Sequence, residues 1–514
     1  MTDASASASH EVETLRKERD EYKKLYVDML AHCRKLELGI LGQKSERFIS
    51  NEAQLTLSVL GTIVKPPDAP QPESIIPEHK RQKPTGRKPL PEHLPRVDIE
   101  IVPPEVEAQG TDAFEKIGED VTETIERRAA STVAVRVHRG KYVAKDKAET
   151  VTSATVLQAP PPELPIPRGL AGPAFLADTI VRRWNDHLPL HRQERIFGRE
   201  GLDIARSTIC GWHAELMHLV TPLLNAMWDD ALLSPYLCTD ATGVLVQALE
   251  KCRHAHFFVV AAPEKHVLFF YSEKHNAAAV DEVLAGYKGY LVADAHSVYD
   301  HLYKRGDVVE VGCWAHARRY FFKALDSDPQ RAREALALIG GLFHFERKWA
   351  SAAPEARSAA RATDAKPILD AFFAWCDDHA AAVLDHTPIS RAIGYARNQR
   401  EALARFLEDG RLPLHNNFSE RALRREALGR KNWLFVGSDE GGDTNATFVS
   451  LLASCQLHDI EPFAYLRDLF CLLPSWPVDR VLDLAPLNWA ATIAKPETIA
   501  KLAANPFRRA SLGG

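Results

Sequence analysis

The stretch HNNFSERALRREALGRKNWLFVGSDEGG, residues 415–442, is the part of the sequence on which the interpretation of the fold depends. Near its start a single carboxylate, that of Glu420, stands in a cluster of cations formed by Arg421, Arg424, Arg425, Arg430 and Lys431. An acid within such a cluster is typical of a site that handles a polyanion or holds a metal ion. We interpret Glu420 as the last of three metal-binding carboxylates, with the earlier chain supplying the other two and the DNA-binding parts.

Length and composition limit the classes of protein to which the chain can belong. Its 514 residues predict roughly two to four domains, and its formal net charge of -5 excludes a generic polycation. A role in nucleic-acid binding must therefore rest on local basic patches. The 8 cysteines are scattered singly with no CxxC pair, which predicts neither a disulfide framework nor structural zinc. No apolar run approaches a membrane span, so we expect a cytoplasmic protein with no membrane partner.

The N-terminal part is expected to contain a coiled-coil helix over residues 12–48, followed by a basic proline-rich linker over residues 62–96. Apolar residues recur at every seventh position of the helix, at Leu15, Tyr22, Met29 and Leu36, which indicates a coiled coil and a dimer. A charged surface helix that docks one stripe on its own domain would show the same pattern. The linker could follow a phosphate backbone, although its composition is more typical of a solvated linker.

Two further regions lie between the linker and residue 234. Residues 97–158 alternate in polarity, which predicts a small β-rich module with strands over 132–138 and 141–144, separated by a turn at Gly140. Residues 172–228 are helical in pattern. A helix over 190–198, a turn at Gly201 and a second helix over 204–212, capped by Ser207 or Thr208, match the helix-turn-helix layout, which generic helical hairpins share. The basic residues of this region that could contact DNA are Arg192, Arg195 and Arg206.

The pattern changes to strands at residue 234, and residues 234–450 are expected to form a mixed α/β domain. The expected strands cover 236–249, 256–262, 266–271, 289–293 and 308–312. Helices are expected over 275–285 and 314–325, followed by a helical insertion over about 326–408. A helical extension over 451–514 completes the chain.

Three acids of this domain could form one site. Asp240 lies within an apolar strand, Asp294 ends a second strand, and Glu420 lies on a helix. An unpaired charge within a strand is costly, and the C-terminal ends of strands are where α/β sites collect. Three carboxylates brought together would supply hard oxygen ligands for two Mg²⁺ or Mn²⁺ ions, which can clamp the attacking and leaving oxygens of a phosphoryl transfer.

Each acid also has a purely structural interpretation. Asp240 could lie in a turn or be a hydrogen-bonded core acid, and Asp294 could cap the helix that follows it. Glu420 fits the third position of a capping box that begins at Asn417. The stretch CWAHARRYF, residues 313–321, is similarly ambiguous. Its Arg318 and Arg319, with Lys323, could contact phosphates, whereas its aromatic residues are typical of a core helix, and Cys313 and His316 lack the second ligand pair of a zinc site.

Several longer motifs together resemble the insertion sequence 66 family of bacterial DDE transposases. These motifs are LGQKSERF at 41–48, GRKPLPEHLPR at 86–96, DHLPLHRQERIFGREGL at 186–202, CWAHARRYF at 313–321 and PLHNNFSERALRREALGRKNWLFVGS at 413–438. The resemblance covers about residues 12 to 489.

The resemblance implies an RNase H-like catalytic domain, a helical DNA-binding region, a small zinc-binding module and an N-terminal leucine-zipper-like helix. It assigns the catalytic and metal-binding acids to Asp240 in CTDAT, Asp294 in VADAHSVYD and Glu420 in the Asn-Asn-x-x-Glu-Arg motif. It also implies that Arg421, Arg424, Arg430 and Lys431 contact substrate phosphates.

The sequence departs from the family pattern at a few positions. The paired cysteines of the small module are absent, with Ala144 after Lys141-Tyr142-Val143, so we expect that the zinc site is lost. His415 stands where the family usually has Asp, and Ala241 and His296 beside the first two acids also differ from the usual residues. None of these differences removes one of the three carboxylates.

The expected function is that of a nucleoid-associated DNA transposase that binds the terminal inverted repeats of its element, nicks their ends and transfers them to target DNA. Its expected partners are double-stranded DNA, a second copy of the chain and accessory proteins of the same element. Two alternatives remain open from the sequence. One is a catalytically inactive or domesticated DNA-binding derivative, and the other is an RNase H-like nuclease without strand transfer.

Overall fold

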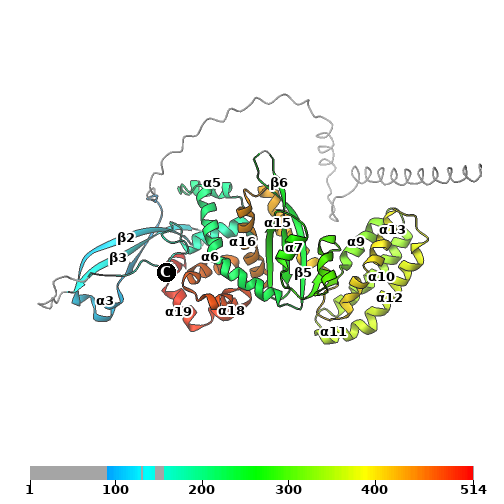
Figure 1. The fold of residues 1–514 in the computed structure, drawn as a ribbon. Helices are drawn as coiled ribbons and strands as arrows, with labels where there is room; N and C mark the ends of the chain where they lie inside the picture. The colour runs from blue at the N-terminus through cyan, green and yellow to red at the C-terminus, as the bar shows by residue number, and fades with distance from the viewer. Residues whose placement is uncertain (1–89, 129–130, 145–155, 250, 513–514) are drawn as a thin grey trace, which may run out of the picture. The chain divides into compact units, whose positions relative to one another are not determined.

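The computed structural model describes residues 90–128, 131–144, 156–249 and 251–512 (Figure 1). The expected coiled coil over 12–48 and most of the expected linker lie outside these residues. Within them the chain is a mixed α/β protein with two sheets and many helices, as the sequence predicts. None of the helices in these ranges is both long and apolar enough to cross a membrane.

The first sheet is built around its central strand, β3. Its strands are β1 (Arg96–Ile101), β2 (Phe114–Arg128), β3 (Ser131–Ala144) and β4 (Leu157–Gln158). β2 pairs antiparallel with β3, while β1 (parallel) and β4 (antiparallel) pair with successive parts of its other side. Val133, Val135 and Val137 alternate along β3 and pack against Phe507 and Ala510 of α20 (Pro506–Leu512). The end of the described chain therefore completes the core of this sheet.

The expected turn at Gly140 was wrong, because β3 continues through this residue, which pairs with Glu119 of β2. A side chain at Gly140 would lie 2.6 Å from the ring of Tyr142, which packs over the glycine. The glycine thus makes room for an aromatic ring within a strand instead of forming a turn. The long strand β2 was not predicted, because charged residues interrupt its alternation.

Glu126 near the end of β2 connects this sheet to the helical region that follows. Its side chain is fully buried, and its Oε1 accepts hydrogen bonds from the backbone amides of Arg127 at 2.8 Å and Phe175 at 2.7 Å. Phe175 lies in the first turn of α4 (Pro173–Ile180), so the carboxyl group caps that helix from another element. Burial raises the pKa of Glu126 to about 8.

The second sheet carries the candidate site. Its strands are β5 (Tyr236–Val246), β6 (Arg253–Ala262), β7 (His266–Ser272), β8 (Gly289–Val292) and β9 (Val308–Val311), all close to the expected positions. Their order is β7-β6-β5-β8-β9. The pairs β5–β6 and β6–β7 are antiparallel, whereas β5–β8 and β8–β9 are parallel. Three strands of a meander are thus extended by two parallel strands, with β5 in the centre.

Helix α16 (Asp439–Leu457) covers the edge strand β7 (Figure 1). The Ser450 hydroxyl accepts from the backbone amide of Phe269 at 2.7 Å, and the Ser454 hydroxyl accepts from that of Val267 at 3.1 Å. Serine side chains therefore satisfy backbone donors that an edge strand would otherwise leave open. α16 runs through residue 450, where the sequence suggested the start of a C-terminal extension.

The remaining elements are mainly helical. Before the second sheet lie α3 (Pro104–Gln109), η1 (Thr111–Ala113), α4, the π-helical turn η2 (Val181–Asn185), α5 (Leu190–Arg199) and α6 (Arg206–Leu232). Between its strands lie α7 (Ala277–Val283), η3 (Ser297–Tyr299) and α8 (Asp300–Arg305). After β9 come α9 (Trp314–Ala324), α10 (Pro329–Lys348), α11 (Pro354–Ala360), the π-helical turn η4 (Arg361–Ala365), α12 (Lys366–Ala380), α13 (Pro388–Asn398), α14 (Arg400–Ala404) and η5 (Arg405–Leu407). The chain ends with α15 (Asn417–Trp433), α16, α17 (Pro462–Leu472), η6 (Leu473–Ser475), η7 (Val478–Leu484), α18 (Pro486–Ile493), α19 (Pro496–Ala504) and α20.

The helices from α9 to α13 pack on one another through aromatic side chains. Trp314 and Phe321 of α9 are fully buried against Phe372 of α12, with ring centroids 5.1 Å and 5.7 Å from it. This packing confirms the core-helix interpretation of these two residues. Tyr320 differs, because it is partly exposed and stacks on Tyr395 of α13 with a centroid distance of 4.7 Å.

Candidate active site

Asp240 and Asp294 occupy equivalent places at one edge of the second sheet. In the parallel pairing of β5 with β8, Cys238 lies opposite Val292, and each acid follows two residues later in its own strand direction. Adjacent parallel strands lie about 4.8 Å apart. The register therefore places the two acids side by side just beyond the parallel pairing, with Asp294 after the end of β8 and Asp240 within β5, which continues to Val246. The C-terminal ends of parallel strands are where α/β sites form.

Glu420 reaches the same edge because a buried asparagine ties its helix to β5. The side-chain amide of Asn416, at the N-terminus of α15, donates to the backbone carbonyl of Thr239 at 2.7 Å. Thr239 immediately precedes Asp240. The side-chain oxygen of Asn416 also accepts from the Ser419 hydroxyl at 2.6 Å. The first turn of α15, which carries Glu420, is thus fixed against the strand that carries Asp240.

The pKa of Asp240 depends on burial and on the two other acids. Burial raises the pKa of the Asp240 carboxyl to about 6, although the backbone amide of Ala241 lowers it by donating a hydrogen bond at 2.8 Å. The negative charges of Asp294 and Glu420 raise it further, and Arg319 lowers it. The charges of Asp294 and Glu420 therefore both act on Asp240, although the three acids come from widely separated parts of the sequence.

Two side chains of α9 face Glu420. The Nε2 of His316 lies 3.4 Å from Glu420 Oε1, and the guanidinium group of Arg319 lies 3.5 Å from the same oxygen. Burial lowers the pKa of His316, and Arg319 lowers it further, while Glu420 and Asp294 raise it. Burial is the largest of these influences, so the surroundings of the imidazole favour its neutral form.

The structural alternatives for Asp294 and Glu420 are excluded by the observed caps. α15 begins at Asn417 with Asn416 at its N-cap, and no side chain forms a cap hydrogen bond there. The expected capping box between Asn417 and Glu420 was therefore wrong. In η3, the cap is provided by His296, whose side chain accepts from the Val298 amide, and not by Asp294. Asp240 lies within β5 and not in a turn.

The donor set fits a hard divalent cation, although the side chains do not surround a common point. Three carboxylates are the ligands that Mg²⁺ and Mn²⁺ prefer, and a cation among them would offset the repulsion that contributes to the raised pKa of Asp240. Within the described ranges, however, no group of three or more His, Cys, Asp or Glu side chains is arranged to hold a metal ion. Metal binding at this edge would thus require the three carboxylates to move toward a common point.

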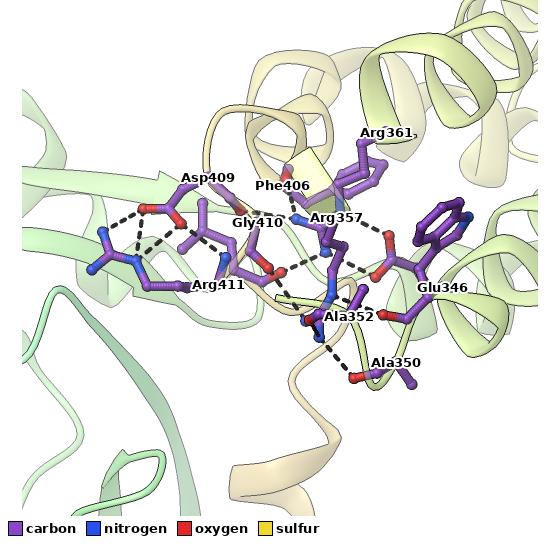
Figure 2. Close-up of polar contacts among 11 residues, drawn as sticks. Glu346, Ala350, Ala352, Arg357, Arg361, Phe406, Asp409, Gly410 and Arg411 are labelled. Carbon is purple, nitrogen blue, oxygen red and sulfur yellow. Dashed lines mark hydrogen bonds and ion pairs between the residues drawn. The ribbon is translucent and has the colours of Figure 1, made fainter. Parts of the chain in front are cut away.

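Arg361 fixes the return of the chain from the helical insertion to the site (Figure 2). This residue is fully buried and forms two hydrogen bonds of 2.8 Å with the carboxylate of Glu346. It also donates to the backbone carbonyls of Phe406, Asp409 and Leu412, the last at 2.9 Å. The segment from η5 to Leu412 is therefore held at three points shortly before Asn416.

Neighbouring groups reinforce this anchor. Arg357 donates to the carbonyls of Trp349, Ala350, Ala352 and Gly410, and Asp409 pairs with Arg411 at 2.6 Å (Figure 2). A side chain at Gly410 would clash with the backbone of Pro354, so glycine is required for this close approach. His415 lies between the anchor and α15, where it stacks on Phe343 of α10 with a centroid distance of 5.8 Å.

The basic residues of α15 divide into an exposed and an anchored group. Arg421, Arg424 and Lys431 are exposed and lie on one face of the helix, as their spacing of three and seven residues requires. Arg430 instead points to β5, where it donates to the backbone carbonyl of Gly243. Arg425 is held by the side chains of Asn185 and Gln456. The three exposed cations remain available for a polyanion, whereas Arg430 and Arg425 join elements of the fold.

The arginines expected to bind DNA at the helix-turn-helix are exposed. Arg192 and Arg195 lie on α5, and Arg206 begins α6. The expected cap was wrong, because α6 starts at Arg206 and not after Ser207 or Thr208. The Arg206 backbone amide donates at 3.1 Å to the Glu194 side chain of α5, which replaces a local cap.

The turn between these helices is supported by the end of the expected linker. Gly201 has a φ of +81°, and a side chain there would lie 2.3 Å from the His93 ring. The His93 ring also forms a 2.8 Å hydrogen bond with the backbone carbonyl of Glu200. The turn thus requires glycine for both its backbone conformation and its close packing.

On α9, the two arginines that the sequence singled out as possible phosphate contacts, Arg318 and Arg319, are both exposed. Arg319 faces Glu420.

Sequence comparisons agree with this organisation. The family model described as "Transposase IS66 family" matches residues 168–444. "Transposase C of IS166 homeodomain" matches residues 33–99, and "IS66 C-terminal element" matches residues 450–487. The first of these matches includes all three acids of the candidate site, the helix-turn-helix and the helical insertion.

Relatives of similar length occur in Sinorhizobium fredii (strain NBRC 101917 / NGR234). "Uncharacterized protein y4hP" is 29% identical over 496 residues, which cover 89% of both chains. "Uncharacterized protein y4qI" is 29% identical over 440 residues, covering 82% of this chain and 79% of the relative. "Uncharacterized protein y4jD" is 27% identical over 508 residues, covering 93% of this chain and 98% of the relative. The similarity therefore extends over nearly the whole chain.

Proposed function

Because this chain belongs to the IS66 family of transposases, we propose that it binds the terminal inverted repeats of its own insertion sequence and catalyses metal-dependent cleavage and strand transfer at their ends. The observation that supports this proposal is that Asp294 and Glu420 lie close enough to Asp240, at one edge of the sheet, for their negative charges to raise its pKa. Metal-assisted phosphoryl transfer at a two-metal site uses such a set of hard oxygen ligands.

The proposed catalytic domain is RNase H-like and includes residues 234–450, with the helical insertion over about 326–408. The mixed sheet with β5 at its centre supports this assignment, because it places the first two acids on neighbouring parallel strands. α15 adds the third acid after the insertion. The insertion thus lies between the second and third acids in the sequence. Arg361 binds the segment where the chain leaves it, through the carbonyls of Asp409 and Leu412.

Each part of the site has a proposed role. Asp240, Asp294 and Glu420 would hold two Mg²⁺ or Mn²⁺ ions, which when bound favour deprotonation of the attacking water and offset charge on the scissile phosphate. His316 and Arg319 orient the Glu420 carboxylate from α9. The exposed Arg421, Arg424 and Lys431, together with Arg318, contact phosphates of the substrate. Arg430 supports this face of α15 through its bond to β5.

DNA ends would be recognised by the helix-turn-helix within residues 172–228, through Arg192, Arg195 and Arg206. The β-rich module over 97–158 would support this region without zinc. The N-terminal helix over 12–48 would join two copies of the chain, and the linker over 62–96 would follow the DNA backbone. Residues 451–514 would form a helical extension, and accessory proteins of the same element are further proposed partners.

A strand-transfer assay tests the function. The wild-type chain is incubated with duplexes that carry the element ends, with and without Mg²⁺, and both cleavage and joining to a target plasmid are measured. Asp240→Ala, Asp294→Ala and Glu420→Ala should each abolish cleavage and joining while binding of the ends survives. A wild-type chain that binds but never cuts would be a DNA-binding derivative. Cleavage without joining would indicate a nuclease, and full activity in any of the three variants contradicts the site.

A further inference from the structure

A strained turn at the end of α15 presents an exposed apolar residue. Leu434 has φ +62° and ψ −46°, and the Phe435 amide donates to the Trp433 carbonyl across it at 2.7 Å. These values define a γ-turn with positive φ, which is rare and strained for a residue with a side chain. The Leu434 side chain is nevertheless 65% exposed, so burial of the leucine does not account for the strain.

The residues on both sides of Leu434 are fixed by the fold. Trp433 packs beneath Arg183, with 5.4 Å between the guanidinium carbon and the ring centroid, and lies over Gly429, where a side chain would be 2.6 Å from the indole nitrogen. Val436 pairs with β5, because its amide donates to Leu245 and its carbonyl accepts from Gln247, both at 2.8 Å. The surrounding structure thus imposes the strained conformation and directs the two residues between the anchors outward.

The turn continues an exposed face that is both basic and apolar. Arg424, Leu428 and Lys431 lie on one side of α15 by their spacing, and all three are exposed. Leu434 and Phe435 follow just after the end of the helix, and Phe435 is 40% exposed. Leu245, beside Phe435 in the pairing with β5, is exposed as well. Exposed cations and exposed large apolar side chains therefore alternate from Arg424 to Phe435.

We propose that Leu434 and Phe435 form a wedge that enters between base pairs of the DNA bound along α15. Proteins that bend DNA insert such apolar side chains at a base step while cations hold the adjacent phosphates. At a rise of 1.5 Å per residue, Leu434 lies about 21 Å along the helix axis from Glu420, roughly six base-pair steps from the site of cleavage. The rigid turn keeps the wedge extended before DNA arrives, so little ordering is needed on binding.

The occupant is DNA and not a second protein because of the charges around the wedge. Arg421, Arg424 and Lys431 on the same face would oppose a second copy of this basic surface, whereas they match a phosphate backbone. The inference rests on the proposed function, since it assumes that substrate DNA follows α15. It adds that the chain deforms this DNA at a fixed distance from the acids.

Fluorescence of 2-aminopurine tests the wedge directly. The base analogue is placed at successive positions of a duplex that carries the element end, and the full chain is added in the presence of a chelator, so that no cleavage occurs. We expect a rise in fluorescence at one step, because the analogue brightens when it is unstacked. The double variant Leu434→Ala/Phe435→Ala should lose this rise and bind the duplex about tenfold more weakly. Val478→Ala, which truncates another exposed apolar residue on η7, should change neither.

A duplex with a mismatch at the responsive step provides a second measurement. Because the mismatch removes most of the cost of unstacking, it should restore binding by the double variant to within about twofold of wild type.

The variant Leu434→Gly distinguishes the effect of backbone strain from that of the side chain's contact with DNA. Glycine adopts positive φ freely, so the variant removes both the strain and the side chain. This variant should raise the Tm of the protein while losing the fluorescence signal, and a loss of Tm instead would contradict a strained turn held for DNA.

The outcomes separate the wedge from the proposed function. If the wild-type chain unstacks the base step but never cuts DNA, the proposed cleavage and strand transfer are refuted and the wedge is supported. A chain that cuts the ends without unstacking any step, or whose double variant retains the signal, would refute the wedge alone. If the double variant changes the mass of the protein in light scattering, the surface is an interface between copies and the wedge is overturned. Failure of the wild-type chain to bind any duplex refutes both.

Discussion

The side-chain amide of Asn416 donates to the backbone carbonyl of Thr239 at 2.7 Å, and so joins the residue before α15 to the residue before Asp240. Both groups are buried. This single bond connects two segments that the whole helical insertion separates in the sequence. It relates the helix of the third acid to the strand of the first, and the Asn416 backbone amide adds a 3.2 Å bond to the Cys313 sulfur.

Loss of this bond should separate catalysis from DNA binding. Asn416→Ala leaves the Thr239 carbonyl without its side-chain partner, which costs about 1–3 kcal/mol of stability, and it frees the first turn of α15. We expect strand cleavage to fall by at least about tenfold, while end binding in a gel-shift assay is unchanged. Asn417→Ala, a matched change at the adjacent and less buried position, should retain most activity. Equal losses in both variants would contradict the assigned role.

Arg361 should be required for the order of the segment that leads to the site. Arg361→Lys keeps the charge but cannot supply the planar fork that contacts Glu346 and three carbonyls. Because the residue is fully buried, we expect a loss of about 3 kcal/mol in the free energy of unfolding. Hydrogen exchange should accelerate in residues 406–416 and not in β5. Arg333→Lys on α10, an exposed site, serves as the control and should have no effect.

Glu426 should make the stability of the protein depend on pH. This carboxyl group on α15 is fully buried, and burial raises its pKa to about 7, although Asn445, Arg183, Arg430 and Arg425 each lower it. The folded state therefore holds the proton over a pH range in which the unfolded state releases it. The contribution of protonated Glu426 to the free energy of unfolding is complete below about pH 4.5 and declines as the pH rises to 7.

The variant Glu426→Gln isolates this effect. Wild type should lose stability relative to the variant by on the order of 2 kcal/mol between pH 5 and pH 8. Chemical denaturation at several pH values in that range measures the difference. A difference that is constant with pH, or that grows toward acid, would show that Glu426 is ionised throughout in the folded chain.

The helix-turn-helix arginines should contribute chiefly through phosphate contacts. Replacing Arg192, Arg195 and Arg206 together by Ala should weaken binding to the element ends and reduce the slope of log K against log salt by roughly 2–3. Fluorescence anisotropy at several salt concentrations gives this slope. The same number of exposed arginines changed on the insertion, at Arg333, Arg391 and Arg397, should leave it unaltered. An unchanged slope in the triple variant of Arg192, Arg195 and Arg206 would show that the element ends bind elsewhere on the protein.

The sequence predicted the strands of the second sheet well because each is a short apolar run bounded by turn residues. Asp240 could be located because a charge within such an apolar strand is conspicuous, and Asp294 because a charge directly follows the end of one. The role of Asn416 could not be predicted, because it depends on a carbonyl far away in the sequence. The pair of asparagines before Glu420 was the only signal, and it suggested a helix cap at the wrong residue.

Long-range packing also explains the other differences. Gly140 is typical of a turn, but the structure uses it to accommodate the Tyr142 ring within β3. The start of α6 was misplaced because its cap comes from Glu194 on the preceding helix and not from a local serine. Arg361 lay in an Ala-rich helical stretch with no distinctive motif, and only the folded chain shows that it closes the insertion. In each case the partner is chosen by tertiary contact and not by neighbouring residues.

The central claim is that Asp240, Asp294 and Glu420 form one divalent metal site, and binding of Mn²⁺ measured by electron paramagnetic resonance tests it most directly. The full-length chain is titrated with Mn²⁺, and the free ion is followed by its signal. Wild type should bind Mn²⁺, and Asp240→Asn, Asp294→Asn and Glu420→Gln should each weaken that binding by about tenfold or more. Glu440→Gln, an exposed acid on α16, should bind as wild type does. Equal binding by wild type and all three site variants, or no binding by wild type, would contradict the account.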